Sequence, residues 1–151
     1  MKKIITITLL FIGLISFAQP QRNGQMRDKI KAQKVAFITE KLELTTDEAE
    51  KFWPIYNAFE ESTYRIKREF FIPIRKQMRK NADISDAQAN SFLDEVIKGE
   101  NQIHRAKQKL LIDLKTAIPA RKIIKLKGVE DEFNRELLQK LRDYRAKRKK
   151  N

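Results

Sequence analysis

The chain has 151 residues, of which 41% are hydrophobic and 35% charged, a composition that fits one folded helical domain. It contains no cysteine, one histidine, four glycines and four prolines. Disulfides, thiolate chemistry, cysteine-held metals and turn-rich β folds are therefore excluded. The formal net charge of +13 directs attention to anionic partners: a polyanion, a membrane surface or an acidic protein.

The first eighteen residues have the layout of a secretory signal peptide. Two lysines follow Met1, residues 4–17 are uncharged and mostly apolar, and Ser16 and Ala18 place small side chains where signal peptidase cleaves. The apolar run is shorter than the roughly 20 residues of a membrane-spanning helix, although an uncleaved anchor is the alternative. We expect cleavage between Ala18 and Gln19 and a periplasmic protein of 133 residues, which keeps a net charge of +11.

Apolar residues at helical spacing predict four helices after a loose leader at 19–25. The first is expected over 26–41. The second begins after a capping box formed by Thr45 and Glu48, contains Pro54, which should bend it, and ends near Pro73. It carries a stripe of residues spaced four and three apart: Phe52, Tyr56, Phe59, Thr63, Ile66 and Phe70.

The other two helices follow a predicted turn at 81–83. One begins after a second capping box, formed by Ser85 and Gln88, and ends near residue 116. The last runs from Pro119, which suits a first helical turn, to about residue 145, with Gly128 as a weak point. We therefore expect an all-α fold: a single domain over 26–145, built as a thin antiparallel layer of long amphipathic helices, followed by a basic tail at 146–151.

Charge is distributed in alternating blocks along the chain. The second and third helices start acidic and end basic, which complements the helix dipole and lets antiparallel neighbours place acidic halves beside basic halves. This arrangement does not require an excess of positive charge. Six of the excess charges lie in the last 13 residues, so the C-terminus is a candidate for contact with an anionic partner.

The chain lacks the residue sets that most enzymes use. His104 is its only imidazole and is interpreted as a surface or half-buried helix residue, and no glycine-rich phosphate loop is present. Acidic pairs such as Glu60 with Glu61 fall in helix starts or on polar faces, and no ligand spacing indicates a metal site. We therefore expect no enzymatic activity, no cofactor and no metal.

Aromatic and basic side chains that crowd together are the candidate binding residues. Phe52, Trp53, Tyr56 and Phe59 are interpreted as core, but a thin helical layer cannot easily bury a second cluster around Phe70 as well. This surplus, with the regular stripe, predicts a homodimer. The candidates for contact with a client or partner are Arg68, Phe70, Phe71, Arg75, Lys76, Arg79, Arg145, Lys147 and Arg148.

Several short motifs resemble those of known exported families. Leu44-Thr45-Thr46-Asp47-Glu48 resembles the motif of the periplasmic LTXXQ proteins, the Spy/CpxP family, with Glu48 in place of the glutamine. Ile118-Pro119 lies where a second such motif is expected. Phe52-Trp53-Pro54-Ile55-Tyr56 and Phe133-Asn134-Arg135-Glu136-Leu137-Leu138 resemble exported Bacteroidetes proteins labelled sensors of ECF-type sigma factors. The resemblance implies a curved antiparallel all-α homodimer with a basic concave face, acting as an ATP-independent chaperone or in envelope-stress signalling.

We therefore expect an exported chaperone-like protein or envelope-stress adaptor, which holds unfolded or envelope proteins on a basic, partly apolar surface. One alternative is a regulator that binds a single membrane stress sensor and has no general chaperone activity. Another is a cationic envelope protein, in peripheral contact with anionic lipid phosphates through its basic tail. Because export removes the chain from the cytosol, nucleic acid is not expected as a partner.

Overall fold

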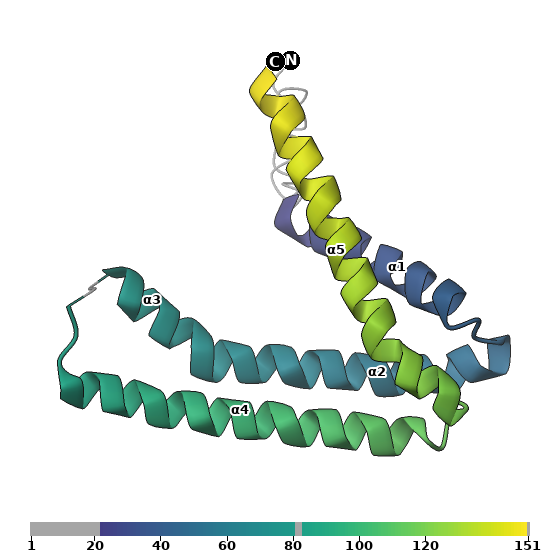
Figure 1. The fold of residues 1–151 in the computed structure, drawn as a ribbon, viewed down its shortest axis with the longest axis horizontal. Coiled ribbons are helices and arrows are strands. Elements are labelled where there is room, and N and C mark those ends of the chain that lie inside the picture. The colour runs from purple at the N-terminus through teal and green to yellow at the C-terminus, as the bar shows by residue number, and fades with distance from the viewer. Residues whose placement is uncertain (1–21, 81–82, 151) are drawn as a thin grey trace, which may run out of the picture. The chain divides into compact units, whose positions relative to one another are not determined.

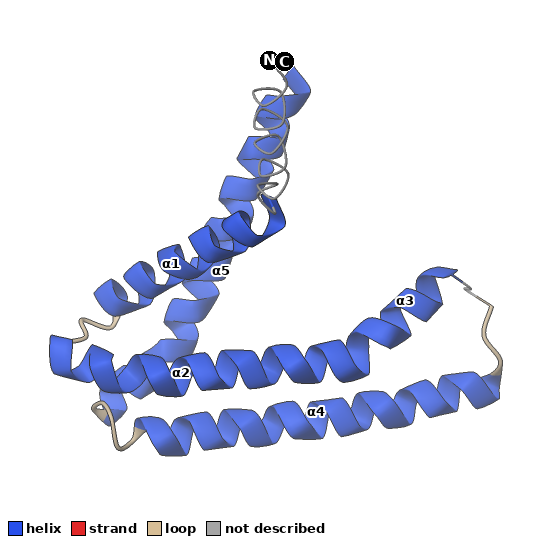
Figure 2. Ribbon diagram, turned by 180° about the vertical axis from the view of Figure 1, so that it is seen from behind, coloured by secondary structure: helices blue, strands red, loops and turns tan. Residues whose placement is uncertain are grey.

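The structure is a computed structural model that describes residues 22–80 and 83–150. These residues are helical apart from short connections, and none of them forms a strand, as Figures 1 and 2 show. The predicted all-α fold is confirmed. The signal peptide, its cleavage site between Ala18 and Gln19, and residues 81–82 of the predicted turn lie outside the described residues. No helix in the described ranges is apolar over a length sufficient to span a bilayer.

The helical elements are α1 (Arg22–Lys41), α2 (Thr46–Ile66), the π-helical turn η1 (Lys67–Phe71), α3 (Ile72–Lys80), α4 (Asp86–Leu114) and α5 (Ala120–Lys150). Since α2, η1 and α3 are contiguous, the described residues form the four helical segments that were predicted. Two boundaries are corrected: residues 22–25 belong to α1 and not to a leader, and 146–150 continue α5. The alanine, lysine and arginine of that tail are strong helix formers, so no sequence signal ends the helix at 145.

The chain divides into two compact units, residues 1–37 and 38–151, and the boundary falls inside α1. In the first unit Met26 is exposed and Phe37 is partly buried. All the buried hydrophobic residues described belong to the second unit, beginning with Ile38. Among the residues of 26–37 whose side chains the structure describes, none is fully buried. The single domain over 26–145 stays a prediction.

In the second unit, α2 and α4 lie side by side and run antiparallel (Figures 1 and 2). We call the continuous helical segment formed by α2, η1 and α3 the arm. Ile66 and Phe70 of the arm pack with Ile103 of α4 in one buried cluster. Phe52 and Tyr56, earlier on the same stripe, are also buried, which confirms the stripe as a core face. Because this face packs against α4 of the same chain, its regular spacing is not evidence for a dimer.

The helical arm does not end near Pro73, as was predicted, but continues to Lys80. Proline has no N–H to donate and its ring would meet the carbonyl four residues earlier in a regular α-helix. The π-helical turn immediately before it changes this register, and the Ile72 N–H donates to the Lys67 carbonyl five residues earlier. Beyond the turn, α3 bends away from α4 (Figure 2). Pro54, by contrast, lies inside α2, which continues through it.

Candidate client-binding surface

The apolar face that joins the arm to α4 continues past the packed core and becomes exposed where α3 bends away. On α4 the buried Gly99 and Ile103 are preceded at helical spacing by Phe92 and Val96, which are only partly buried. We call this region the tip surface. It comprises Phe71, Ile74 and Met78 of the arm, Phe92 and Val96 of α4, and the cations Arg68, Arg75, Lys76 and Arg79.

Exposure increases toward the end of α3. Phe71 and Ile74 are partly buried, and Met78, one turn further on, has 41% of its surface exposed. These three residues are spaced three and four apart, so they share one side of the helix. The cause is the bend at η1, which separates α3 from the helix that would otherwise cover it.

Phe70 and Phe71 were predicted to contact a client, and the structure places them differently. Phe70 is buried against Ile66 and Ile103, so that prediction is wrong for Phe70, which is a core residue. Phe71 is partly buried and packs against the same cluster. Its ring lies over Gly99, where an added Cβ would stand 2.7 Å from Phe71 Cε2 and 3.0 Å from Phe70 Cβ. Gly99 thus permits close approach of η1 and α4. Phe71 is the last residue of this core and lies where the tip surface begins.

The four predicted cations of the arm are brought together on η1 and α3. Arg68, Arg75, Lys76 and Arg79 are all exposed. The start of α4 carries carboxylates such as Asp86 and Asp94, as the charge pattern predicted, but no ion pair among the described residues joins them to these cations. The charges of these four side chains are therefore exposed to solvent.

The other three predicted basic residues are not part of this surface. Arg145, Lys147 and Arg148 are exposed in the last turns of α5, a helix that contributes nothing to the tip surface. The structure therefore splits the predicted binding residues into an arm group and an α5 group.

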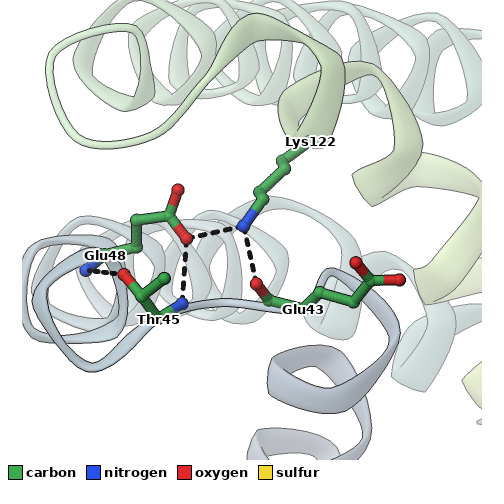
Figure 3. A network of polar contacts seen from close by, with 4 residues as sticks. All are labelled: Glu43, Thr45, Glu48 and Lys122. Carbon is green, nitrogen blue, oxygen red and sulfur yellow. Dashed lines mark hydrogen bonds and ion pairs between the residues drawn. The ribbon is translucent and has the colours of Figure 1, made fainter.

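The LTXXQ-like segment forms a helix start that is tied to α5 (Figure 3). Thr45 Oγ1 accepts from the Glu48 N–H, and Glu48 Oε2 accepts from the Thr45 N–H at 2.9 Å, which confirms the capping box. Lys122 Nζ lies 2.6 Å from Glu48 Oε2 and donates at 2.6 Å to the Glu43 carbonyl. The hydrogen bond from Lys122 and the one from the Thr45 N–H lower the pKa of Glu48. The carboxylate at this position thus has a cationic partner 74 residues away.

The turn before this segment is a Schellman motif built without glycine. The Leu44 N–H donates to the Thr39 carbonyl and the Glu43 N–H to the Glu40 carbonyl, both at 3.0 Å. Glu43 has a φ of 51°, in the left-handed region that glycine adopts more readily. The bond from Lys122 to its carbonyl helps to hold this conformation.

The aromatic segment of α2 is structural. Phe52 stacks on Tyr56 with ring centroids 5.3 Å apart, and Trp53 meets both rings edge-on. The Tyr56 hydroxyl donates at 2.5 Å to Glu130 of α5. Burial, and then the charge of Glu130, raise the pKa of Tyr56. The residues of the family-like motifs therefore hold α2 and α5 together.

The residues at the start of α5 also have a structural role. Ile118 is buried, and the Pro119 carbonyl accepts from the N–H groups of Lys122 and Ile123 at the first turn.

Near Trp53 the surface has an open hollow, lined by Thr39, Leu44, Thr45, Thr46, Ala49, Glu50, Trp53 and Pro54. Its polar side chains are the Glu50 carboxylate and three threonine hydroxyls. In the ranges that the structure describes, no three histidine or acidic side chains gather as metal ligands would.

Sequence reasoning missed the α4 half of the tip surface, because Phe92 and Val96 were not among the predicted binding residues. The signal that could have found it is Pro73, which interrupts the partner helix opposite this part of α4. Comparison of the chain with family models, curated proteins and solved structures found no match.

Proposed function

We propose that this protein is an exported, Spy/CpxP-like, ATP-independent chaperone or envelope-stress adaptor that holds partly unfolded proteins on its tip surface. The observation that carries the proposal is the continuation of the apolar core face onto an exposed helix end rimmed by unpaired cations. Met78 and the partly buried Ile74 provide the apolar contact, and Arg75 and Arg79 provide the charge.

The two kinds of side chain act at different steps. Exposed cations attract acidic segments over a distance of about 10 Å at 0.1 M salt and so raise the encounter rate. The apolar side chains then retain a chain that exposes its own hydrophobic residues. Because the apolar area is small, retention is weak and reversible, which suits release without ATP.

The test is suppression of aggregation by the mature protein, measured by light scattering with several unrelated unfolded clients. We expect suppression at low salt and a clear loss of it near about 1 M salt, where exposed charges are screened within about 3 Å. Ile74→Ser combined with Met78→Ser should abolish most of the effect. The matched control is Ile124→Ser, which removes an 82% exposed side chain from α5 and should change nothing.

Circular dichroism of each variant separates loss of binding from loss of folding. No suppression for any client would reject the general-chaperone function and favour a regulator that recognises one envelope-stress sensor. Equal losses in the α3 variant and the Ile124 control would show that the tip surface is not the binding site.

A further inference from the structure

A row of exposed side chains runs along one face of the second half of α5, away from the tip surface. Its members, spaced three, four and three apart, are Arg135, Leu138, Arg142 and Arg145. At about 100° per residue, the four lie within an arc of about 80° on the helix surface. The three arginines are exposed, and Leu138 has 53% of its surface exposed. We call these four residues the α5 stripe.

The acidic side chains of α5 are engaged by residues other than these arginines. The contacts are Asp131 with Lys127, Glu132 with Lys41, Glu136 with Lys140, and Glu130 with Tyr56. In the described part of the chain, no ion pair includes an arginine of the α5 stripe. Asp143 is displaced by about 120° around the helix from the middle of the stripe. Three guanidinium groups therefore face solvent with no carboxylate bound to them.

The residue types of the stripe favour phosphate at an apolar boundary. A guanidinium group presents N–H donors in a planar fork that matches two phosphate oxygens, and it is weakly hydrated. Leu138 lies between Arg135 and Arg142 and gains nothing from a small anion in water. A lipid bilayer serves both kinds of side chain, because its headgroup phosphates accept from arginine and its acyl boundary takes up the leucine.

We propose that the α5 stripe lies flat on a bilayer that contains anionic phospholipid and holds the protein at the membrane surface. Each cation near an anionic lipid surface strengthens binding by about fivefold. Lys147 and Arg148, in the next turn, are exposed as well and add to the attraction, which extends about 10 Å at 0.1 M salt. The α5 group of basic residues thus has a role apart from the arm group.

This role goes beyond the holding of clients, because it uses no residue of α4 or the arm. The arm offers a matched comparison, since it also has three exposed arginines near an exposed isoleucine: Arg68, Arg75, Arg79 and Ile72. The helix that follows the arm in the chain begins with acidic residues such as Asp86 and Asp94. These carboxylates weaken the attraction of the arm to an anionic surface.

The first test is sedimentation of the mature protein with vesicles of phosphatidylglycerol and phosphatidylethanolamine in equal parts. We expect binding at low salt, and replacement of the three α5 arginines by glutamine should weaken it on the order of 100-fold. The control replaces the three arm arginines by glutamine, which removes the same charge and should leave most of the binding. No binding of the wild type, or equal losses in the two triple variants, would overturn the proposal. Suppression of client aggregation by the α5 variant reports the tip surface separately and should be unchanged.

The second test separates a bilayer from a soluble phosphate polymer. Leu138→Ser should weaken vesicle binding by roughly fivefold, because its apolar side chain no longer enters the acyl boundary, and should leave binding to inorganic polyphosphate unchanged. Ile112→Ser is the matched control, since it removes a 66% exposed apolar side chain from α4. Unchanged vesicle binding by Leu138→Ser, or an equal loss in the Ile112 control, would contradict insertion of the α5 stripe into a bilayer surface.

Discussion

Two glycines within helices should respond in opposite ways to the same substitution. At Gly99 an added Cβ would stand 2.7 Å from the Phe71 ring and 3.0 Å from Phe70 Cβ, which is too close for both contacts to remain as they are. At Gly128 in α5 nothing lies within 4 Å of the added Cβ. We therefore compare Gly99→Ala with Gly128→Ala, which differ only in what the new methyl group meets.

The expected magnitudes follow from two terms. Replacing glycine by alanine in a helix interior gains about 1 kcal/mol at either position. At Gly128 this gain is unopposed, so the free energy of unfolding should rise by about 1 kcal/mol. At Gly99 overpacking costs about 1–3 kcal/mol, which offsets or exceeds the gain, so the net change should lie between about zero and a loss of 2 kcal/mol.

Urea unfolding followed by far-ultraviolet circular dichroism measures both changes. The denaturant slope should stay the same, so that a shift of the midpoint reports stability alone. In a Phe71→Ala background, Gly99→Ala should lose most of its penalty, because the nearest ring atoms are gone. If the two alanine variants are equally stabilised, the close approach of the arm to α4 at Gly99 is refuted.

Three further outcomes concern the junction of α1, α2 and α5. Glu43→Gly should raise stability by about 1 kcal/mol in thermal unfolding, since its left-handed backbone is strained for glutamate. Because the pKa of Glu48 is lowered in the fold, its ionised form stabilises the fold above the usual value of 4.5, and this stabilisation is lost as the pH falls through the lower folded value. Acid titration of Lys122→Met should show a weaker dependence, since the hydrogen bond from the Thr45 N–H remains. Tyr56→Phe should lower the free energy of unfolding by about 1–3 kcal/mol, because the hydrogen bond to Glu130 is lost. Since the pKa of Tyr56 is raised in the fold, ionisation of Tyr56 destabilises the fold above pH 10.0, and the fall of stability with rising pH should be less steep in this variant.

Local patterns predicted the helices well because their causes are local. The two capping boxes depend on residues three apart, and the α2 stripe depends on spacing along one helix. The ion pair between Glu48 and Lys122 could not be predicted in this way, since it joins residues 74 apart that only the fold brings together.

The candidate site was predicted in part. Its basic residues on the arm were found, because surface charge is visible in sequence. Phe70 was misplaced, since spacing shows that a residue belongs to a stripe but not where the partner helix stops covering it. The two helices stop packing at the π-helical turn before Pro73. Helix propensities do not reveal such a change in the hydrogen-bond register of a helix. The α4 contribution from Phe92 depends on the same bend.

Site-specific crosslinking to an unfolded client tests the central claim most directly. A photoactivatable thiol probe is attached at Met78→Cys on α3 or at Ile124→Cys on α5, both exposed positions in a chain without native cysteine. We predict client adducts from position 78 at low salt, a strong decrease near about 1 M salt, and few adducts from position 124. Equal adduct yields from the two positions, or none from position 78 while aggregation is still suppressed, would contradict client binding at the tip surface.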